Sequence, residues 1–180
     1  MQLILLASSA KAKTYCGTER ILDAPVKTLT YKTQYPTRFQ FPGTEDFIYV
    51  NQGFAEPSSD KPLVSEGFSR CIPIIVKNPS TNNFVLLHVD SLDINYRQEE
   101  SIEELKTGDV RLQAIVVVGT ETWHRVGIRQ NFQRLGIDLL REINIETGRC
   151  HFGVGFDPLK NTVMVCRKVP KKEVLFFNGF

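Results

Sequence analysis

Short apolar runs separated by polar stretches dominate the chain and predict a protein built mainly from β-strands. Runs of about four to eight residues that are rich in β-branched and aromatic side chains are typical of strands. The run over 111–119 is nearly continuous, so we expect that strand to be covered on both faces. The clear runs cover residues 46–52, 71–76, 84–89, 111–119, 150–157, 162–169 and 173–178, with a weaker one over 26–31.

Two helical patterns lie in the middle of the chain. Over 100–108, Ser101 and Glu104 have the spacing of a capping box, and Gly108 is a natural stop. After Thr120–Thr122, apolar residues recur at helical spacing. These residues are Val126, Phe132, Leu135, Leu139, Leu140 and Ile143. The stretch 55–62 is polar and predicts a loop, whereas 158–161 predicts the turn of a hairpin. The pattern therefore predicts an α/β domain with a mixed or antiparallel sheet covered by helices.

The composition places the chain among ordinary globular proteins. It has 180 residues, 42% of them hydrophobic and 23% charged, with a net charge of +2. We therefore expect one domain over 1–180 with a weakly patterned N-terminal extension over about 1–45. The low charge gives no indication of a nucleic-acid or membrane partner.

The N-terminal segment and the cysteines indicate where the protein is located and whether its thiols are reduced. The apolar start, Leu3–Ala7, is too short for a signal peptide and is not preceded by Lys or Arg, so a short strand is expected there. No stretch approaches the length of a membrane span. The expectation is a soluble protein, cytoplasmic unless it is exported. Four widely spaced cysteines without a C-x-x-C motif favour reduced thiols over a zinc site or a disulfide framework.

One hairpin carries a possible catalytic pair. Cys71 begins the run 71–76 and His88 lies near the end of the run 84–89. Directly opposed residues of an antiparallel pair have position numbers with a constant sum, which for Cys71 and His88 is 159. That sum predicts a turn centred between Pro79 and Ser80, and Asn78–Thr81 has the residues of a type I turn there. Opposed side chains share one face at about 4.5–5.5 Å between Cβ atoms, so thiol and imidazole could meet.

Spacing alone leaves a second interpretation open. Cysteine is among the most buried residue types, and Cys71 and His88 could simply be core residues. A one-residue slip of the hairpin would place them on opposite faces. Pro73 lies inside the first strand, where it suits an edge or a bulge because it has no N–H to donate.

The stretch around this hairpin resembles the active-site segment of the protein N-terminal asparagine amidohydrolase family. That family has a Tyr-Val stretch, a Gly- or Ser-containing approach to a cysteine, and a strand, turn and strand ending in His-x-Asp. The corresponding residues are Tyr49, Val50, Ser65, Cys71, His88 and Asp90, and "AIVVVGTE" over 114–121 resembles the strand and glycine that follow. The seventeen-residue step from Cys71 to His88 is similar to that of CheD-type chemoreceptor glutamine deamidases. Toxin deamidases of the cytotoxic-necrotizing-factor type share the Cys–His core, and the resemblance covers roughly 46–145.

The resemblance implies both a fold and a reaction. The implied fold is α/β, with two layers of mixed or antiparallel β-sheet flanked by helices in the order α/β/β/α. The implied enzyme converts a protein Gln to Glu, or Asn to Asp, through a thioester with release of ammonia. Cys71 is then the nucleophile and His88 the general acid and base. No metal or organic cofactor is implied, and the partner is a protein or peptide that bears Gln or Asn.

Some positions depart from the family pattern. The deamidases carry a small Gly/Ser pair before the cysteine, where this chain has Phe68-Ser69-Arg70. CheD-type enzymes have a threonine six residues before the cysteine, where this chain has Ser65. Ser65 is the candidate third catalytic residue, because its hydroxyl could fix the tautomer of His88.

Other interpretations remain open at this point. A catalytically inactive peptide- or protein-binding module on the same fold is the main competitor, since Arg70 replaces a small residue. The length slightly favours a protein glutamine deamidase over an N-terminal asparagine amidohydrolase, and an amine in place of water would give a transglutaminase. Further candidates with weaker patterns are Asp90 as an orienting group, Trp123 and His124 beside a cleft, the Cys150–His151 pair, and Cys166 in the core.

Overall fold

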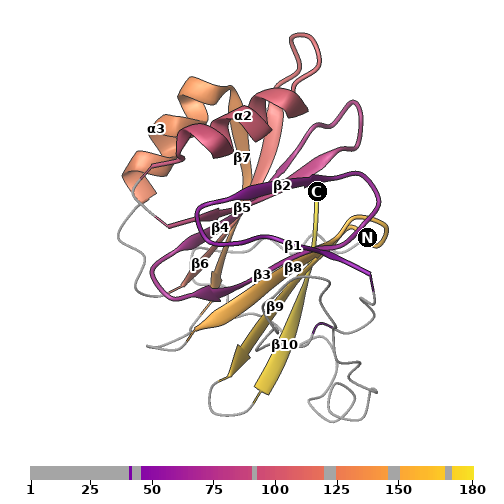
Figure 1. The fold of residues 1–180 in the computed structure, drawn as a ribbon, viewed down its shortest axis with the longest axis vertical. Helices are drawn as coiled ribbons and strands as arrows, with labels where there is room; N and C mark the ends of the chain where they lie inside the picture. The colour runs from indigo at the N-terminus through magenta and orange to yellow at the C-terminus, as the bar shows by residue number, and fades with distance from the viewer. Residues whose placement is uncertain (1–40, 42–45, 91–92, 120–124, 146–150, 169–171) are drawn as a thin grey trace.

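The computed structural model describes Phe41 and residues 46–90, 93–119, 125–145, 151–168 and 172–180. Two five-stranded sheets form the fold, in the strand orders β1-β3-β8-β9-β10 (sheet I) and β2-β5-β4-β6-β7 (sheet II) (Figure 1). Sheet I comprises β1 (Ile48–Tyr49), β3 (Leu63–Phe68), β8 (Phe152–Asp157), β9 (Thr162–Lys168) and β10 (Lys172–Asn178). Sheet II comprises β2 (Ala55–Ser58), β4 (Ile72–Lys77), β5 (Phe84–Val89), β6 (Leu112–Gly119) and β7 (Ile137–Ile145). The helices are α2 (Tyr96–Leu105) and α3 (Arg125–Leu135).

Both sheets are mixed, which confirms the predicted α/β class with mostly strands. β1 pairs with β3 and β6 with β7 in parallel, and the other pairs are antiparallel. The hairpin of β8 and β9 forms as predicted, with Pro158–Asn161 as its turn. The apolar run of β6 is buried on both faces, as its sequence predicts.

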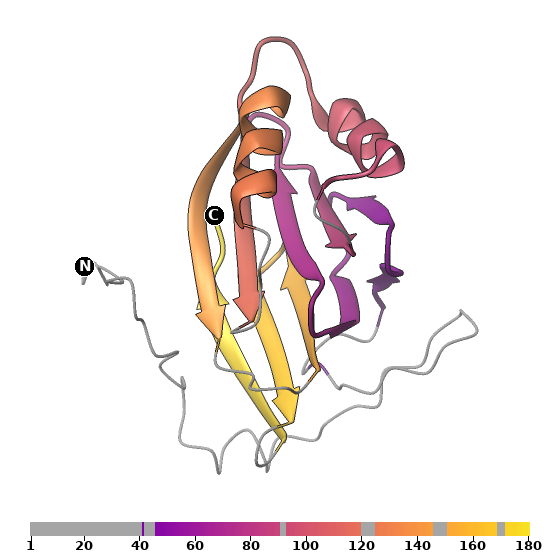
Figure 2. The same ribbon diagram turned by 90° about the vertical axis from the view of Figure 1, so that its left-hand side faces the viewer.

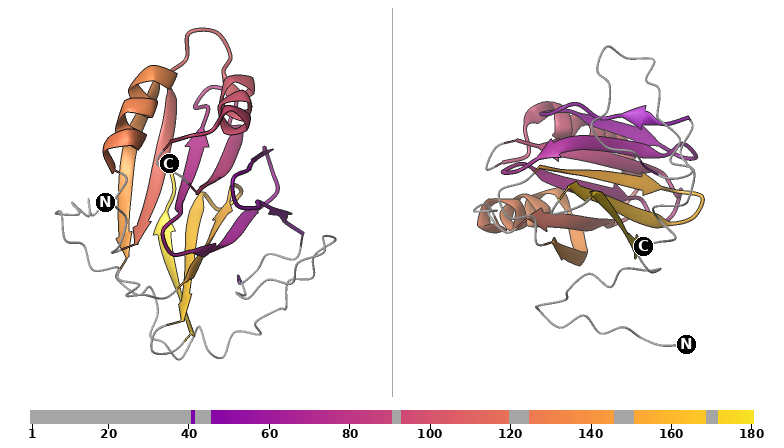
Figure 3. Two further views of the ribbon diagram at one scale, coloured as in Figure 1. Left: turned by 60° about the vertical axis from the view of Figure 1, so that its left-hand side comes forward. Right: turned by 90° about the horizontal axis from the view of Figure 1, so that it is seen from below.

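Apolar side chains divide the described structure into layers. One cluster fills the space between the sheets, with Phe68, Phe84, Leu86, Ile115, Phe152 and Phe156 among its members. A second cluster joins the opposite face of sheet II to both helices, through Ile102 and Leu105 of α2 and Ile128 and Phe132 of α3. Both helices therefore cover sheet II and lie toward one end of the molecule, while β8, β9 and β10 extend toward the other (Figures 1 and 2). The view from below in Figure 3 shows both helices on the same side of the strands.

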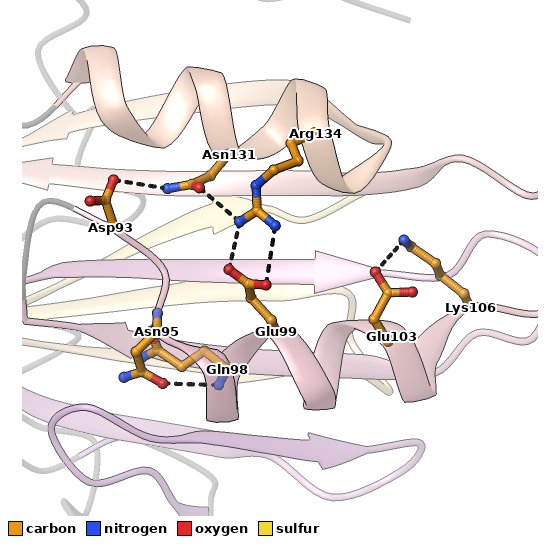
Figure 4. A network of polar contacts seen from close by, with 8 residues as sticks. All are labelled: Asp93, Asn95, Gln98, Glu99, Glu103, Lys106, Asn131 and Arg134. Atoms are coloured by element: carbon orange, nitrogen blue, oxygen red, sulfur yellow. Dashed lines mark hydrogen bonds and ion pairs between the residues drawn. The ribbon is translucent and has the colours of Figure 1, made fainter.

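Polar contacts hold the two helices together over sheet II. The guanidinium of Arg134 donates to both carboxylate oxygens of Glu99, at 3.1 and 2.5 Å. It also donates to Asn131, whose side-chain amide donates to Asp93 just before α2 (Figure 4). A bidentate arginine–carboxylate pair fixes geometry better than a single ion pair does. The network therefore sets the position of α2, which contacts the backbone of the candidate site.

The predicted helices differ from the observed ones at their ends. The predicted capping box at Ser101 and Glu104 is wrong, because Asn95 and Gln98 form the box and start α2 earlier. The second predicted helix continues too far, since α3 stops before Gly136, whose φ is +67°. The apolar residues after it, Leu139, Leu140 and Ile143, belong to β7, which pairs along β6.

Besides β7, two further strands lie where the sequence predicted none. β2 occupies part of the predicted polar loop, because its residues pair with Phe84–Leu87 of β5. β3 pairs with β8 and carries Ser65 into the interior. The expected strands over 3–7 and 26–31, together with Cys16, Trp123, His124 and Cys150, lie outside the described residues. Among the described residues, no helix is long and apolar enough to cross a membrane.

Candidate active site

The hairpin of β4 and β5 has a different register from the predicted one. His88 is paired with Pro73, not with Cys71, so the predicted direct opposition of Cys71 and His88 is wrong. The register differs because the loop is longer than a type I turn. The hairpin closes between Asn78 and Asn83, with Asn82 in the left-handed region at φ 61°. The side chain of Asn78 holds this loop by accepting from the N–H groups of the two residues after Pro79.

The predicted common face is nevertheless present. Cys71 lies in the bend directly before β4, two residues before Pro73. Cys71 packs, half-buried, against the apolar cluster between the sheets, and that is also the face on which His88 contacts Phe68. Because Pro73 is the residue opposite His88, Cys71 is a diagonal neighbour of His88 on the adjacent chain segment. Diagonal neighbours have Cα atoms about 7–8 Å apart and their Cβ atoms somewhat closer, a separation that an imidazole ring can span.

Pro73 is tolerated in this central strand because of the same register. The N–H of His88 donates to Phe54 and its carbonyl accepts from Gly53, so both groups bond to the β2 side. Pro73 and His88 are thus a non-hydrogen-bonded pair, in which side chains approach more closely. The pairing of β4 with β6 starts only at Ile74. The missing N–H of Pro73 therefore costs neither ladder a hydrogen bond.

A hydrogen bond from one sheet to the other fixes the imidazole of His88. Oγ of Ser65, on β3, lies 2.9 Å from Nδ1 of His88, on β5, and both residues are buried. The Ser65 hydroxyl also lies 2.6 Å from the carbonyl oxygen of Val50, to which it donates. A hydroxyl has one hydrogen, so Ser65 must accept from His88. Nδ1 of His88 therefore carries the proton, and Nε2 is left with its lone pair.

Nε2 of His88 is buried and has no hydrogen-bond partner among the described residues. Because Nδ1 carries the proton, the lone pair of Nε2 is available to accept a proton or a hydrogen bond. Burial lowers the pKa of His88 to about 4. The imidazole is therefore neutral near pH 7, which is the form that can accept a proton.

The thiol of Cys71 is also neutral in the resting protein. Burial raises its pKa, the charge of Asp90 raises it further, and its own backbone N–H lowers it. The pair is thus a neutral thiol on the same face as a neutral imidazole, not a preformed thiolate–imidazolium pair. A proton must move from sulfur to Nε2 when a substrate carbonyl is in place.

Phe68 and Gly67 shape the approach to the cysteine. The Phe68 ring lies over the His88 ring, with centroids 4.0 Å apart and an interplanar angle of 32°. Phe68 is fully buried, so it shields one face of the imidazole from water. Gly67 forms a β-bulge between β3 and β8 and has a φ of +88°, which favours glycine. Phe68, three residues before Cys71, is therefore part of the wall of the site.

The backbone of His88 is anchored from two other elements. Its carbonyl accepts from the N–H of Gly53 at 2.9 Å and from the Gln98 side chain of α2 at 3.0 Å. Asn95 caps α2 and also donates to the carbonyl of Gly53 at 2.9 Å. Gly53, Asn95 and Gln98 were not predicted from the sequence; the N-x-x-Q spacing of a capping box is the signal for Asn95 and Gln98.

The other candidate residues, Asp90, His151 and Cys166, do not bind the imidazole of His88. Asp90 follows His88 by two positions and lies at the surface, close enough to act electrostatically on Cys71. Within the described residues its carboxylate makes no hydrogen bond to the imidazole, whose Nδ1 is already held by Ser65. His151 is exposed, and Nδ1 of its ring lies 3.3 Å from the carbonyl oxygen of Gly67 at the bulge. Cys166 is in the core, on the outer face of sheet I, as expected.

No cluster of His, Cys, Asp or Glu side chains in the described ranges could hold a metal ion. A cavity of about 310 Å³ lies on sheet I, beside the turn between β8 and β9, and its lining includes Asp157, Lys160, Met164 and Phe176. None of Ser65, Cys71 and His88 contributes to it. That cavity is therefore separate from the Cys–His site.

Comparisons with known proteins leave the family open. The sequence matches no model of a protein family. A search of curated proteins finds no significant match either. Any assignment of function therefore depends on the residues and their geometry.

Proposed function

We propose that the protein is a cysteine-dependent amidohydrolase that acts on the side-chain carboxamide of Gln or Asn in a protein or peptide. One observation carries the proposal: Ser65 fixes the tautomer that leaves a buried, unpaired lone pair on Nε2 of His88, on the face shared with Cys71. In most core histidines both ring nitrogens have hydrogen-bond partners. An unpaired base beside a thiol suits nucleophilic catalysis.

The first half-reaction forms a thioester. Nε2 of His88 takes the proton from the Cys71 thiol as sulfur attacks the carboxamide carbon. The C–S bond forms, and the C=O electron pair moves to oxygen. When the tetrahedral intermediate collapses, the C–N bond breaks and Nε2 returns the proton to the departing ammonia.

The second half-reaction releases the acid. Water attacks the thioester carbon and gives a proton to Nε2, the C–S bond breaks, and the thiol regains that proton. Throughout the cycle Ser65 keeps Nδ1 protonated, so only Nε2 exchanges protons. The transient charge on the ring is stabilised by the hydroxyl of Ser65, which is polarised by its own bond to Val50. The oxyanion needs hydrogen-bond donors, and backbone N–H groups of the bend that leads to Cys71 are the nearest candidates.

The architecture is compatible with this proposal. The resemblance to CheD-type and toxin deamidases implies a fold with two layers of β-sheet flanked by helices. The described part of the chain has two stacked sheets and helices on sheet II, with Phe41, Val64 and Met164 on the outer face of sheet I. We place the chain in that α/β/β/α class as part of the proposal.

A peptide-binding module without turnover is the second candidate. The raised pKa of Cys71 favours it, and so does the lack of a hydrogen bond between Cys71 and Nε2 of His88. The two functions differ in one measurable product, which is ammonia.

The test uses short peptides that carry a single Asn or Gln. Ammonia release and conversion of the carboxamide to the acid, read by mass spectrometry, are measured with wild type and with Cys71→Ser. Turnover by wild type that Cys71→Ser lacks supports the proposal. Binding of a peptide without release of ammonia supports the module instead. Cys166→Ser is the matched control, because Cys166 lies in the core of sheet I away from the pair.

A further inference from the structure

Among the described strands, the two sheets have four edge strands, and three of these have features that oppose pairing with a further strand. β1 has only two residues, β2 contains Pro57, and β7 has a bulge at Leu140. Short strands, prolines and bulges are the usual protection of a sheet edge. β10, the outermost strand of sheet I, has none of them, because its seven residues pair with β9 without a break in register (Figure 1).

The outer edge of β10 presents backbone groups that can pair with another strand. The N–H of Gly179 donates to the carbonyl of Asn161, so these residues form a hydrogen-bonded pair at the end of the ladder between β9 and β10. Hydrogen-bonded and non-hydrogen-bonded pairs alternate along an antiparallel ladder, so the N–H and C=O groups of Phe176 and Asn178 point away from β9. Within the described part of the chain, only the carbonyl of Asn178 among these groups has a partner, the guanidinium of Arg141.

The cavity of about 310 Å³ lies beside the end of this edge. β10 contributes Phe176, Phe177 and Asn178 to its lining, and β9 contributes Met164. Met164 and Phe176 also belong to the apolar cluster on the outer face of sheet I. Opposed residues of neighbouring strands share one face, so a residue opposite Phe176 on an added strand has its side chain on the outer face, over the cavity. An open edge beside an apolar cavity suits strand addition, in which main-chain bonds give affinity and a pocket gives specificity.

The charges around the cavity favour an acidic partner. The carboxylate in its lining, Asp157, is buried and binds Lys160 at 2.8 Å, and Glu173 of β10 binds Arg167 at 2.8 Å. Arg141 has no ion pair within the described ranges, and its guanidinium lies at the open edge because it contacts an outward-facing carbonyl of β10. A guanidinium has several N–H donors, so it can keep that carbonyl and bind a carboxylate as well.

We propose that β10 and this cavity bind an extended segment of a partner polypeptide. The segment adds a strand to sheet I, places an apolar side chain in the cavity and presents an acidic residue to Arg141. This surface is independent of the Cys–His pair, because β8 and β9 separate β10 from β3, the strand that carries Ser65. A segment bound along β10 therefore does not block the candidate active site.

The probes are fluorescein-labelled peptides of seven residues, the length of β10, in which Thr alternates with Val, Leu or Phe. Each peptide has a Glu or a Lys at one of the Thr positions. Fluorescence anisotropy gives Kd for wild type, Arg141→Gln and, as a control, Arg129→Gln, an exposed arginine of α3. Wild type and Arg129→Gln should bind the best Glu peptide about two- to fivefold more tightly than its Lys counterpart, the effect of one exposed ion pair. Arg141→Gln should lose that preference, and an unchanged preference overturns the role of Arg141.

Two further measurements test the strand pairing itself. Phe176→Pro removes an outward N–H and no bond of the ladder with β9, so the folded variant should bind none of the peptides. In wild type, N-methylation of one alternate set of peptide nitrogens should abolish binding and methylation of the other set should not, because the side chain in the cavity fixes which peptide edge faces β10. Binding of no peptide, unchanged binding to Phe176→Pro, or equal effects of the two methylation sets overturns the inference. So does a wild-type dimer in analytical ultracentrifugation that Phe176→Pro lacks, since the edge then binds a second copy.

Discussion

The hydroxyl of Ser65 accepts a hydrogen bond from Nδ1 of His88 across the interface between the two sheets. Ser65 belongs to β3 and His88 to β5, so the contact forms only when the sheets are packed together. Because Ser65 donates its only hydrogen to Val50, the contact decides which ring nitrogen can act as a base. The folding of the core and the protonation pattern of the candidate site are therefore linked.

Replacing Ser65 with alanine should reduce turnover without abolishing it. The variant loses the acceptor for Nδ1–H of His88, so the tautomer and the ring orientation are no longer fixed. We expect kcat to fall by about ten- to a thousandfold, less than the loss of a general base, which is worth roughly 10²–10⁴. The free energy of unfolding should fall by about 1–3 kcal/mol, because the Val50 carbonyl and Nδ1–H are both left unpaired in the core.

Ser80→Ala is the matched control for this variant, since Ser80 lies exposed in the hairpin loop. It should keep wild-type kcat. If folded Ser65→Ala were as inactive as Cys71→Ser, Ser65 would be a full member of the catalytic machinery. If it kept wild-type kcat, it would have no role in orienting His88.

Stability should fall in mild acid because of His88. Its pKa is about 4 in the folded protein, below the ordinary value of 6.5. The unfolded chain therefore binds the proton first, so the contribution is complete above about pH 6.5 and is lost as pH falls toward 4. The expected slope from this group is at most about 1.4 kcal/mol per pH unit, measured by urea unfolding between these pH values.

A variant without the imidazole shows how much His88 contributes to the pH dependence of the free energy of unfolding. His88→Gln, which puts a side chain without a titratable group at this position, should remove that part of the slope. The same slope in wild type and His88→Gln would show that His88 is not buried in its neutral form.

Some features of the candidate site could be predicted from the sequence and others could not. The common face of Cys71 and His88 was predictable from strand alternation, because a register change of two residues preserves the face. The register itself was not, since Asn82 adopts a left-handed conformation and lengthens the loop. Ser65 was identified only through a family resemblance, because "LVSEGF" alternates poorly and its strand was missed. The bond from Ser65 to His88 joins two sheets, and local patterns carry no information about that packing.

The end of the second helix could not be predicted from the sequence for a similar reason. Leu139, Leu140 and Ile143 have helical spacing, yet they form a strand because Gly136 ends α3 and β6 offers an edge to pair with. The pairing partner in space thus overrode the local periodicity.

The bulge at Gly67 should matter more for activity than for stability. Its φ of +88° is unfavourable for alanine, although no atom lies within 4 Å of an added Cβ. Gly67→Ala should lose about 1–2 kcal/mol of stability from backbone strain. Because Phe68 and Cys71 follow the bulge, kcat should also fall. Gly108→Ala has a comparable φ of +62° and equally open surroundings far from the site, so it should lose similar stability with unchanged kcat.

Cys71 should react slowly with iodoacetamide near neutral pH in the free protein. Burial and the charge of Asp90 both raise its pKa. The alkylation rate of Cys71, followed by peptide mass, should therefore rise only above the ordinary thiol pKa of about 8.5. Asp90→Asn should shift this rise to lower pH. A fast reaction of the wild-type thiol at pH 6–7 would show a preformed thiolate instead.

The most direct test of the central claim is to trap the thioester on Cys71. Hydroxylamine is added during turnover of the carboxamide peptide that releases ammonia fastest, and the product is analysed by mass spectrometry. The account predicts a hydroxamate with wild type, a reduced amount with Ser65→Ala, and none with Cys71→Ser or His88→Ala. Hydroxamate formed by Cys71→Ser at the wild-type rate, or ammonia released by wild type without any hydroxamate, would contradict the account.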